Sequence, residues 1–385
     1  MKACHYPRSF YLAVAANFFF FASFQWIYAT LPGFVQSIGG DLVQVGLATG
    51  IFALSAVAAR PVVGRLADRW GRKPLLLAGA TLFALAPACY ALVASVWPFM
   101  AIRVVHGIGL AAFTTAYTAF VADLAPPAQR GETIGLAGVT SNLGLLFMPA
   151  LGAMALAQWG YAPHFLAAAG VAAVGVVLIL SVTEPKRDRP DPANVRLGAV
   201  LRLRPVWVAA LASTGLAVAY GVTLSFMAPL ATERGLTAAG AYFSAFAATL
   251  MPAQVLAGWL SDRIGRRAVA APGLAVAALA TAWLAVAHSD AALLAAGAAL
   301  GLSWGLVRVG LDTAVVDAVP AESRGTAIGL LYTCFDAGVG VGAFGLGVAA
   351  QQYGYATAFG LAAAWAAVAL AAYLGLSRTR ETTGA

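Results

Sequence analysis

Long uninterrupted stretches of hydrophobic residues make up most of this chain, and short polar segments separate them. The stretches match the roughly 20 apolar residues that a helix needs to cross a bilayer. They are not the alternating segments of about ten residues that build a membrane β-barrel. We therefore predict an all-α membrane protein with twelve transmembrane helices, near residues 10–31, 43–66, 74–96, 98–122, 132–157, 161–182, 205–231, 236–260, 268–288, 290–316, 325–350 and 354–376.

Composition supports this prediction, because 61% of the 385 residues are hydrophobic and only 10% are charged, whereas a soluble domain carries roughly 25% charged residues. Twelve spans leave short loops, which excludes a soluble enzyme and a large signalling domain. The apolar stretch after Phe10 continues past Leu31, so we interpret it as the first span and not as a cleaved signal peptide. Isolated Cys4, Cys89 and Cys334 indicate neither a disulfide framework nor a metal site.

The net charge of +8 is explained by where the basic residues lie. If the N-terminus is inside, 19 of the 23 Lys and Arg fall in inner segments, and only Arg234 falls in an outer loop. Such a bias sets the orientation of membrane proteins. We expect a multi-pass protein of the inner (plasma) membrane with both termini in the cytoplasm, and no nucleic-acid partner.

The chain contains an internal duplication. Residues 64–73 match 258–267 at six of ten positions, and 121–136 match 315–330 at eight of sixteen, both with a register shift of 194. We predict an N-terminal six-helix bundle (1–182), a charged cytoplasmic linker (183–204) and a C-terminal six-helix bundle (205–385). Two parallel repeats suit a transporter that rocks one half against the other.

The loop after the second span carries a family resemblance. Gly64, Asp68, Arg69, Gly71, Arg72 and Lys73 resemble the signature loop of the major facilitator superfamily, and its second copy is Gly258, Asp262, Arg263, Gly265, Arg266 and Arg267. The resemblance implies the fold of that superfamily and a conformational latch that stabilises one access state, with Asp68 as its central acid. An alternative is that these residues only anchor the cytoplasmic surface. That reading explains the arginines but neither Asp68 nor the glycines.

Polar residues that occur inside the spans of one half only are candidates for function, because burying them is costly. At the shift of 194, Arg103 and His106 align with Gly297 and Leu300. Their segment resembles the fourth-helix arginine motif of proton-coupled members, which implies that Arg103 holds a carboxylate. Otherwise Arg103 snorkels to the interface or pairs with backbone carbonyls. His106 either titrates near neutral pH or is a packing residue.

The second half has its own unmatched charges, since Arg308 and Asp312 replace Thr114 and Thr118, and Asp336 replaces Asn142. Arg308 and Asp312 share a helical face and form either a gate pair or a substrate contact. Asp336 falls at mid-membrane and is our candidate for the proton-carrying carboxylate. The alternative is a permanent ion pair, for example with Arg60.

The direction of transport rests on the fifth span. Gly135, Gly144, Pro149 and Gly152 partly match the glycine-rich signature of exporters in this superfamily, which favours proton-coupled export (antiport) over a symporter that takes up a metabolite. The first span has no carboxylate, which disfavours a cationic drug there. Residues expected to line a central cavity for a small amphipathic organic solute are Asn17, Gln25, Tyr117, Asn142, Tyr220, Trp304 and Tyr332.

We therefore expect a monomeric secondary transporter that works by alternating access, is driven by the proton gradient and needs no cofactor. Its partners are a small-molecule substrate, protons and the lipid bilayer. A membrane-embedded enzyme or a sensor is disfavoured, because the sequence shows no catalytic constellation and no soluble domain.

Overall fold

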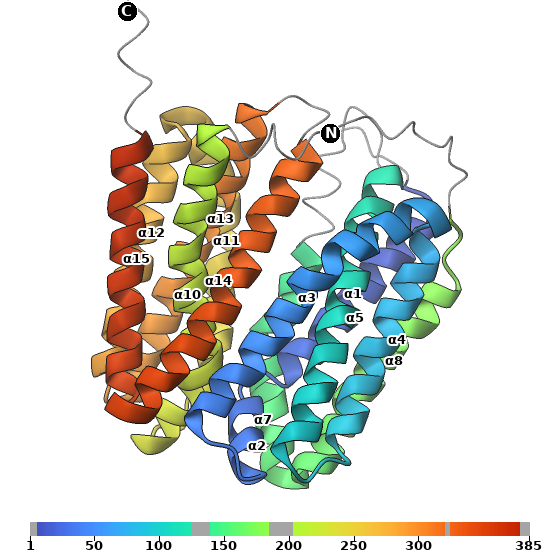
Figure 1. The fold of residues 1–385 in the computed structure, drawn as a ribbon, viewed down its shortest axis with the longest axis horizontal. Helices are drawn as coiled ribbons and strands as arrows, with labels where there is room; N and C mark the ends of the chain where they lie inside the picture. The colour runs from blue at the N-terminus through green and yellow to red at the C-terminus, as the bar shows by residue number, and fades with distance from the viewer. Residues whose placement is uncertain (1–5, 125–138, 185–202, 320–323, 378–385) are drawn as a thin grey trace, which may run out of the picture. The chain divides into compact units, whose positions relative to one another are not determined.

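All regular structure in the described residues is helical in the computed structural model, which describes residues 6–124, 139–184, 203–319 and 324–377 (Figure 1). Ten helices are long and apolar enough to cross a membrane, and two bent helix pairs bring the number to twelve if each pair is one span. The prediction of an all-helical twelve-span chain is confirmed on that count. The helices are α1 (Arg8–Trp26), α2 (Leu31–Ser37), α3 (Leu42–Trp70), α4 (Arg72–Tyr90), α5 (Val96–Leu124), α7 (Met148–Trp159), α8 (Tyr161–Leu180), α10 (Arg204–Glu233), α11 (Ala239–Ile264), α12 (Arg266–Val286), α13 (Asp290–Ala318), α14 (Arg324–Tyr353) and α15 (Tyr355–Ser377), with a short 3₁₀ helix η2 (Gly144–Leu146).

The chain divides into two compact units. Unit 1 consists of Met1–Gly40 and Ile51–Asp188, and unit 2 of Asp41–Gly50 and Arg189–Ala385. In unit 1, α4 packs on α5 and α8, and α1 packs on α8 and α7. In unit 2, α13 packs on α11 and α12, and α10 packs on α14 and α15. The predicted linker lies mostly outside the described residues, so the boundaries of the two predicted halves stay a prediction.

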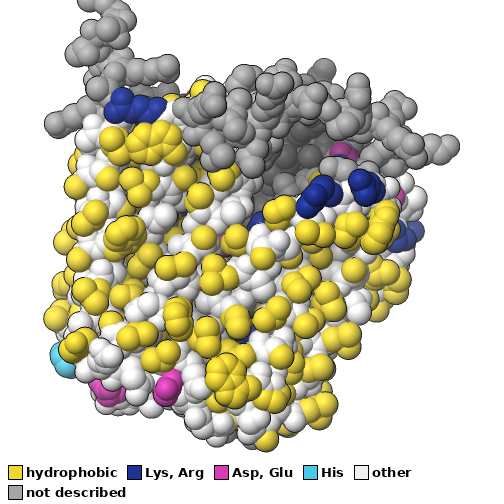
Figure 2. Space-filling model, viewed as in Figure 1, with side chains coloured by type: hydrophobic (Ala, Val, Ile, Leu, Met, Phe, Trp, Pro, Cys, Tyr) yellow, Lys and Arg dark blue, Asp and Glu magenta, His cyan; other side chains and the backbone are white. Residues whose placement is uncertain are grey.

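Hydrophobic side chains cover most of the visible face of each unit, and the few charged side chains lie toward helix ends (Figure 2). Large apolar side chains such as Leu92, Leu279 and Val255 are more than two thirds exposed. In water an apolar surface of this extent is unstable, whereas in a bilayer it contacts lipid chains. The surface therefore agrees with a multi-pass membrane protein.

The first span differs from the single helix predicted over residues 10–31, because it is broken. α1 ends at Trp26, α2 begins at Leu31, and the two are bent by 45°. Pro32 occupies the first turn of α2. It has no backbone N–H to donate and its ring would clash with the preceding turn of a continuous helix. The helix therefore stops and restarts there.

A buried histidine ties the two sides of this break to α8. Trp26 Nε1 donates to His164 Nδ1 at 3.1 Å, and Thr30 Oγ1 lies 2.8 Å from His164 Nε2. Tryptophan only donates, so Nδ1 accepts and Nε2 carries the proton of the neutral ring. The Thr30 hydroxyl donates in turn to the Ile27 carbonyl at 3.1 Å. These bonds satisfy polar groups at the position where the helix of the first span is interrupted.

The fifth span, predicted as one helix over 132–157, is also bent. Its described part consists of Val139–Leu146 and Met148–Trp159, which meet at 42°. Pro149 lies in the first turn of α7, so the reason is the same as in the first span. Residues 132–138 lie outside the described residues.

An arginine and an aspartate stabilise helix termini at one end of unit 2. Arg234, the single basic residue predicted in an outer loop, donates to the carbonyls of Leu284 at 3.1 Å and Ala285 at 2.6 Å, and also to that of Ala287. Asp290 accepts from the backbone of Thr237 at 2.9 Å and of Ala238 at 3.0 Å. A cation at a helix C-terminus and an anion at an N-terminus are both favourable. This role explains why one arginine departs from the charge bias.

The duplication extends to the packing of the second span against the fourth in each unit. In unit 1 a methyl group on Gly107 would overlap the carbonyl oxygen of Phe52. In unit 2 a methyl group on Gly301 would overlap the carbonyl oxygen of Phe246. Both members of each pair are related by the shift of 194. Small residues let membrane helices approach closely, so both units use one glycine at the same crossing.

We predict that Gly107→Ala and Gly301→Ala each lower the stability of the purified protein by about 1–3 kcal/mol, because the added methyl group overpacks a helix crossing. Thermal unfolding in detergent measures this change. The control is Gly170→Ala in α8, where no described atom lies within 4 Å of the new methyl group. It should leave the melting temperature unchanged or raise it slightly. Equal melting temperatures for all three variants would contradict the crossing assignment.

Candidate functional site

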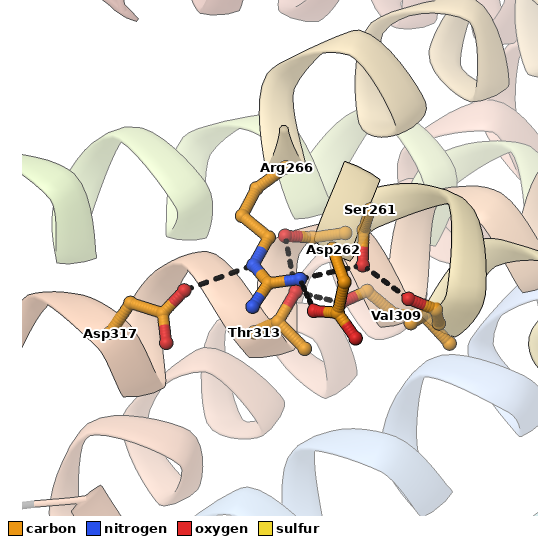
Figure 3. Close-up of polar contacts among 8 residues, drawn as sticks. Ser261, Asp262, Arg266, Val309, Thr313 and Asp317 are labelled. Carbon is orange, nitrogen blue, oxygen red and sulfur yellow. Dashed lines mark hydrogen bonds and ion pairs between the residues drawn. The ribbon is translucent and has the colours of Figure 1, made fainter. Parts of the chain in front are cut away.

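The turn between α11 and α12 in unit 2 holds a compact charged group (Figure 3). Arg266 Nε donates to Asp317 Oδ2 of α13 at 2.9 Å, and Arg266 Nη1 donates to Ser261 Oγ at 2.8 Å and to Asp262 Oδ1. Arg267 Nη2 donates to the Leu374 carbonyl of α15 at 2.9 Å. The Arg263 guanidinium lies 3.7 Å from the centre of the Trp259 ring. This group joins the turn to α13 and α15.

The equivalent turn of unit 1 makes the same two connections. Arg72 Nε lies 3.4 Å from Asp123 Oδ2 of α5, and Lys73 Nζ donates to the Leu180 carbonyl of α8 at 2.9 Å. Arg72, Lys73, Asp123 and Leu180 are each displaced by 194 from Arg266, Arg267, Asp317 and Leu374. The repeat seen in the sequence is therefore also a repeat of contacts.

Glu184, which is not among the residues predicted from the sequence, adds a contact to unit 1. Its carboxylate accepts from the backbone N–H of Arg72 at 2.6 Å and of Lys73 at 3.3 Å. Those N–H groups open α4 and have no partner within the helix, and a negative charge there is stabilising. The corresponding position in the second half is Arg378, so a carboxylate occurs in one copy only. That asymmetry was visible in the sequence just beyond the sixth span.

The other predicted latch residues differ in backbone conformation, packing and exposure. Gly71 has φ +103°, a backbone conformation that favours glycine. Gly64 lies inside α3, where no described atom is within 4 Å of an added Cβ, so close packing does not require it. Arg69 is exposed, and the side chain of Asp68 lies outside the described residues. The structure thus joins Arg72, Lys73, Asp262 and Arg266 to neighbouring helices.

Arg103 and His106 are buried within unit 1, with exposed fractions of 2% and 0%. The Arg103 guanidinium lies 4.2 Å from the centre of the Phe52 ring. Tyr90 Oη lies 2.8 Å from His106 Nδ1, and His106 also contacts the ring of Phe83. Burial of Arg103 within the protein favours a protein partner over the snorkelling alternative, and that alternative and pairing with backbone carbonyls stay predictions. A role in proton coupling stays a prediction.

Polar residues of the first and fifth spans meet in unit 1. Asn17 Nδ2 donates to Thr140 Oγ1 and to Ser141 Oγ, both at 2.9 Å, and Gln25 Nε2 donates to the Ser141 carbonyl at 2.7 Å. Asn17 and Gln25 are buried. Two other predicted residues lie nearby in sequence or space: Asn142 follows Ser141 and is half-buried, and Tyr117 hydrogen-bonds to Thr140.

Arg60 lies in the same unit and contacts a different residue. Its Nη1 lies 3.5 Å from Thr114 Oγ1 of α5. Position 114 is the one that Arg308 occupies in the second half. The predicted pairing of Arg60 with Asp336 joins the two units and stays a prediction.

Three of the predicted charges gather in unit 2 around one tyrosine. Arg308 Nη2 of α13 lies 3.6 Å from Asp312 Oδ2, and the Tyr332 hydroxyl of α14 donates to the same oxygen at 3.1 Å. The Arg308 guanidinium lies 4.0 Å from the centre of the Tyr332 ring and interacts electrostatically with Asp336. We call Arg308, Asp312, Tyr332 and Asp336 the charged cluster. It is partly open, because the side chain of Asp312 is 26% exposed.

Aromatic rings adjoin the charged cluster in unit 2. The rings of Tyr220 and Trp304 are 4.4 Å apart, and Phe335 lies 5.1 Å from Trp304 and 5.3 Å from the Arg308 guanidinium. Phe246 closes the group at 5.9 Å from Trp304. The predicted cavity residues Tyr220, Trp304 and Tyr332 thus come together. Aromatic faces next to charges suit an amphipathic organic molecule.

The model of the Major Facilitator Superfamily matches residues 13–251 and 230–384, which is nearly the whole chain. This chain belongs to the Major Facilitator Superfamily. Its helices and its family model are those of a multi-pass membrane protein, and the relatives and structural neighbours reported below are named as transporters or efflux proteins. The resemblance drawn from the signature loop is confirmed.

Relatives within the superfamily include efflux proteins. The chain is 29% identical over 184 residues to the multi-drug resistance efflux pump PmrA homolog of Lactococcus lactis, covering 46% of this chain and 45% of that protein. It is 30% identical over 184 residues to the multidrug resistance protein MdtG of Serratia proteamaculans, covering 46% and 44%. The matches thus span less than half of each relative. An MFS-type transporter of Methanocaldococcus jannaschii, MJ1560, is 21% identical over 90% of this chain and 92% of that protein.

Solved structures of superfamily members have the same fold. The nucleoside transporter NupG superposes with a TM-score of 0.78 at 14% identity, covering 97% of this chain and 100% of that one. A bacterial homolog of the human lysosomal transporter Spinster superposes with a TM-score of 0.80 at 18% identity, covering 96% of both chains. Identities this low establish the superfamily fold and not the substrate.

We predict that Glu184→Gln loosens the first turn of α4, because it removes the charge that stabilises the N–H groups of Arg72 and Lys73. A loss of about 1 kcal/mol is typical for an N-terminal cap. Hydrogen exchange of the peptide covering residues 72–76 should become faster in the purified protein. Glu233→Gln, at an exposed carboxylate at the end of α10, is the control and should exchange like the wild type there. Unchanged exchange in Glu184→Gln would show that the cap does not hold this turn.

Proposed function

We propose that this transporter exports a small amphipathic organic solute with an aromatic part by alternating access, in exchange for protons. The observation that supports the proposal best is the charged cluster beside the rings of Tyr220, Trp304 and Phe335 in unit 2. Rings bind the apolar part of a solute, while charges at their edge bind its polar part.

Coupling to protons is supported by carboxylates inside the spans. Asp312 and Asp336 share one cationic neighbour, Arg308. A carboxylate at this depth is costly when ionised, so gain and loss of a proton is the chemistry that it supplies. Arg103 and His106 form a second candidate relay within unit 1.

Export is supported by the names of relatives and by the fifth span. Proteins named as multidrug resistance or efflux proteins match this chain at 25–30% identity. Gly144 and Gly152 of the exporter-like signature lie where a Cβ would press on Gln25 and on the Trp26 carbonyl of the first span. These glycines allow the two broken spans to pack closely.

The proposal includes the membrane in which the protein lies and the side on which its termini lie. The distribution of Lys and Arg supports an inner (plasma) membrane protein with both termini in the cytoplasm. One chain matches the family model along both repeats, which supports a monomer as the working unit.

The direction of transport is tested in inverted and right-side-out vesicles after a thermal-shift screen of the purified chain has found a ligand. We expect addition of that ligand outside acid-loaded vesicles to release protons from the lumen. Entry of protons together with the ligand would contradict export by exchange and establish a symporter for uptake.

We predict that Asp336→Asn abolishes pH-driven transport and leaves binding of the screened ligand within about twofold. The carboxylate can no longer contribute to the charge balance around Arg308, while the rings that bind the ligand are unchanged. Binding is measured by thermal shift and transport in vesicles. Asp41→Asn, at an exposed helix-capping carboxylate, is the control and should transport like the wild type. Full pH-driven transport in Asp336→Asn would remove Asp336 from the mechanism.

We predict that Trp304→Leu weakens binding of the same ligand by up to about tenfold and leaves the response to the pH gradient at saturating ligand unchanged. Loss of an aromatic contact costs roughly 0.5–1.5 kcal/mol beyond its area, and tenfold corresponds to about 1.4 kcal/mol. Leu279→Ala, on the exposed face of α12, is the control. Equal affinity in Trp304→Leu and the wild type would place the ligand elsewhere.

A further inference from the structure

Each unit has an apolar groove between the third and fourth spans of its repeat. The groove of unit 1 lies between α4 and α5, and its lining includes Leu82, Leu85 and Ala86 of α4 and Ala101 and Val105 of α5. The groove of unit 2 lies between α12 and α13. Every residue that lines one groove has a counterpart, displaced by 194, that lines the other. Both have a volume of about 320 Å³, so the fold builds the same groove twice.

A close helix contact marks the deep end of each groove. A methyl group on Gly79 of α4 would overlap the backbone nitrogen of Phe113 of α5. A methyl group on Gly273 of α12 would lie 3.1 Å from the backbone nitrogen of Val307 of α13. Two helices that touch at one point and cross at an angle separate away from that point, so side chains must fill the widening space. The grooves lie in this space, toward the loop that joins the two helices.

Small residues leave that space unfilled. Ala86 and Ala280 form the bottom of the grooves, with exposed fractions of 2% and 4%. Leu85 and Leu279 are exposed and form part of the walls. The inside of a protein is close-packed, and atoms beside an empty space lose dispersion contacts. Because the grooves are open on the surface, a molecule outside the chain can supply those contacts.

The lining decides what kind of molecule that is. The side chains of both grooves are Ala, Val, Leu and Ile, with one Cys and one Trp. A bound water needs about two to four polar partners, which such a lining does not offer. All four helices around the grooves are long and apolar enough to cross a membrane, so their exposed faces meet hydrocarbon. A hydrocarbon chain therefore matches the grooves.

A tryptophan that is more than half exposed lies at the other end of each groove. In unit 2 it is Trp283, which belongs to the lining and lies three residues before the end of α12. In unit 1 it is Trp97, the second residue of α5 and one turn from Ala101. The repeat does not relate the two, because positions 89 and 291 hold Cys and Ala. Since tryptophan is enriched at the level of lipid headgroups, both grooves end at that level.

We propose that each groove binds one acyl chain of a phospholipid, in the half of the membrane opposite the charged turns. The chain end lies toward Gly79 or Gly273, and the headgroup lies beside Trp97 or Trp283. This lipid is not the transported solute, so the inference does not rest on the proposed function. The chain covers the alanines at the bottom of the groove and completes the packing between two spans of each repeat.

Photolabelling tests the proposal on the full chain in vesicles of phosphatidylcholine with a trace of phosphatidylcholine that carries a diazirine in one acyl chain. Mass spectrometry locates the labelled residues after irradiation. We expect the groove residues to be labelled about tenfold more than the exposed Leu361 and Val368 of α15, which corresponds to about 1.4 kcal/mol and to roughly ten additional atom contacts. Equal labelling would overturn the proposal.

The position of the diazirine along the chain tests how the lipid is oriented. A diazirine near the headgroup should label Cys89 and Trp283, because these lie at the ends of α4 and α12 away from the charged turns. A diazirine at the chain end should label Leu82 and Val276. The opposite order would overturn the placement of the headgroup.

Two variants that fill the grooves are controls for each other. Ala101→Phe fills the groove of unit 1 and Ala295→Phe fills that of unit 2, and both alanines are exposed, so each ring has room. Each variant should reduce the labelling of its own groove about tenfold and retain that of the other, which also shows that the chain is folded. Ala367→Phe, at an exposed position of α15, should change neither. Undiminished labelling in a filled groove would overturn the proposal.

Two other occupants would give different results. If a second copy of the chain covered the grooves, oxidation of a variant with serine in place of Cys4 and Cys334 would cross-link the exposed Cys89 between copies. If the transported solute filled them, the ligand found by thermal shift would displace the lipid label. Either result would overturn the proposal, whereas labelling that the ligand leaves unchanged supports it.

Discussion

A charged side chain inside an apolar helix bundle is stable only beside a partner, because the bilayer supplies no water to solvate it. This constraint organises the polar structure of the transporter. Arg308 lies against Asp312 and two aromatic rings, Arg103 is enclosed against Phe52, and His164 is bonded on both ring nitrogens. At helix ends the partners are backbone groups, as with Arg234 and Glu184. Few charges exist, and each described one inside a span belongs to a specific contact.

The duplication distinguishes contacts that occur in both units from charged residues that occur in one unit only. Both units share the arginine–aspartate bridge from the charged turn, the basic residue on a carbonyl, and the glycine at the crossing of the second and fourth spans. These contacts maintain the architecture of a six-helix repeat. The charged cluster occurs in unit 2 only, and Arg103 with His106 in unit 1 only. Unshared charges are therefore the better guide to transport, since folding alone does not require them.

The sequence identifies candidate residues more readily than it identifies the partners of those residues. Arg308, Asp312 and Asp336 stood out because they replace neutral residues at the shift of 194, but their gathering around Tyr332 depends on how α13 packs beside α14. Asp123 and Asp317 were visible as identical residues of the repeat, although their role as acceptors for Arg72 and Arg266 was not. Glu184 lies just beyond the sixth span, so a comparison of charges inside the spans does not single it out. The breaks at Pro32 and Pro149 were missed because hydropathy averages over a proline.

The sequence by itself determined the class, the number of spans, the duplication and the superfamily. The length of an apolar stretch and the spacing of a repeated motif can both be read along the chain without a three-dimensional structure. Only the tertiary structure decided which polar groups meet. A hydrogen bond such as Tyr332 to Asp312 depends on the rotation and depth of two helices, and hydrophobic stretches with little amphipathic pattern leave both undetermined. The sequence shows that the spans contain few charged residues. The packing of the helices decides which groups those residues contact.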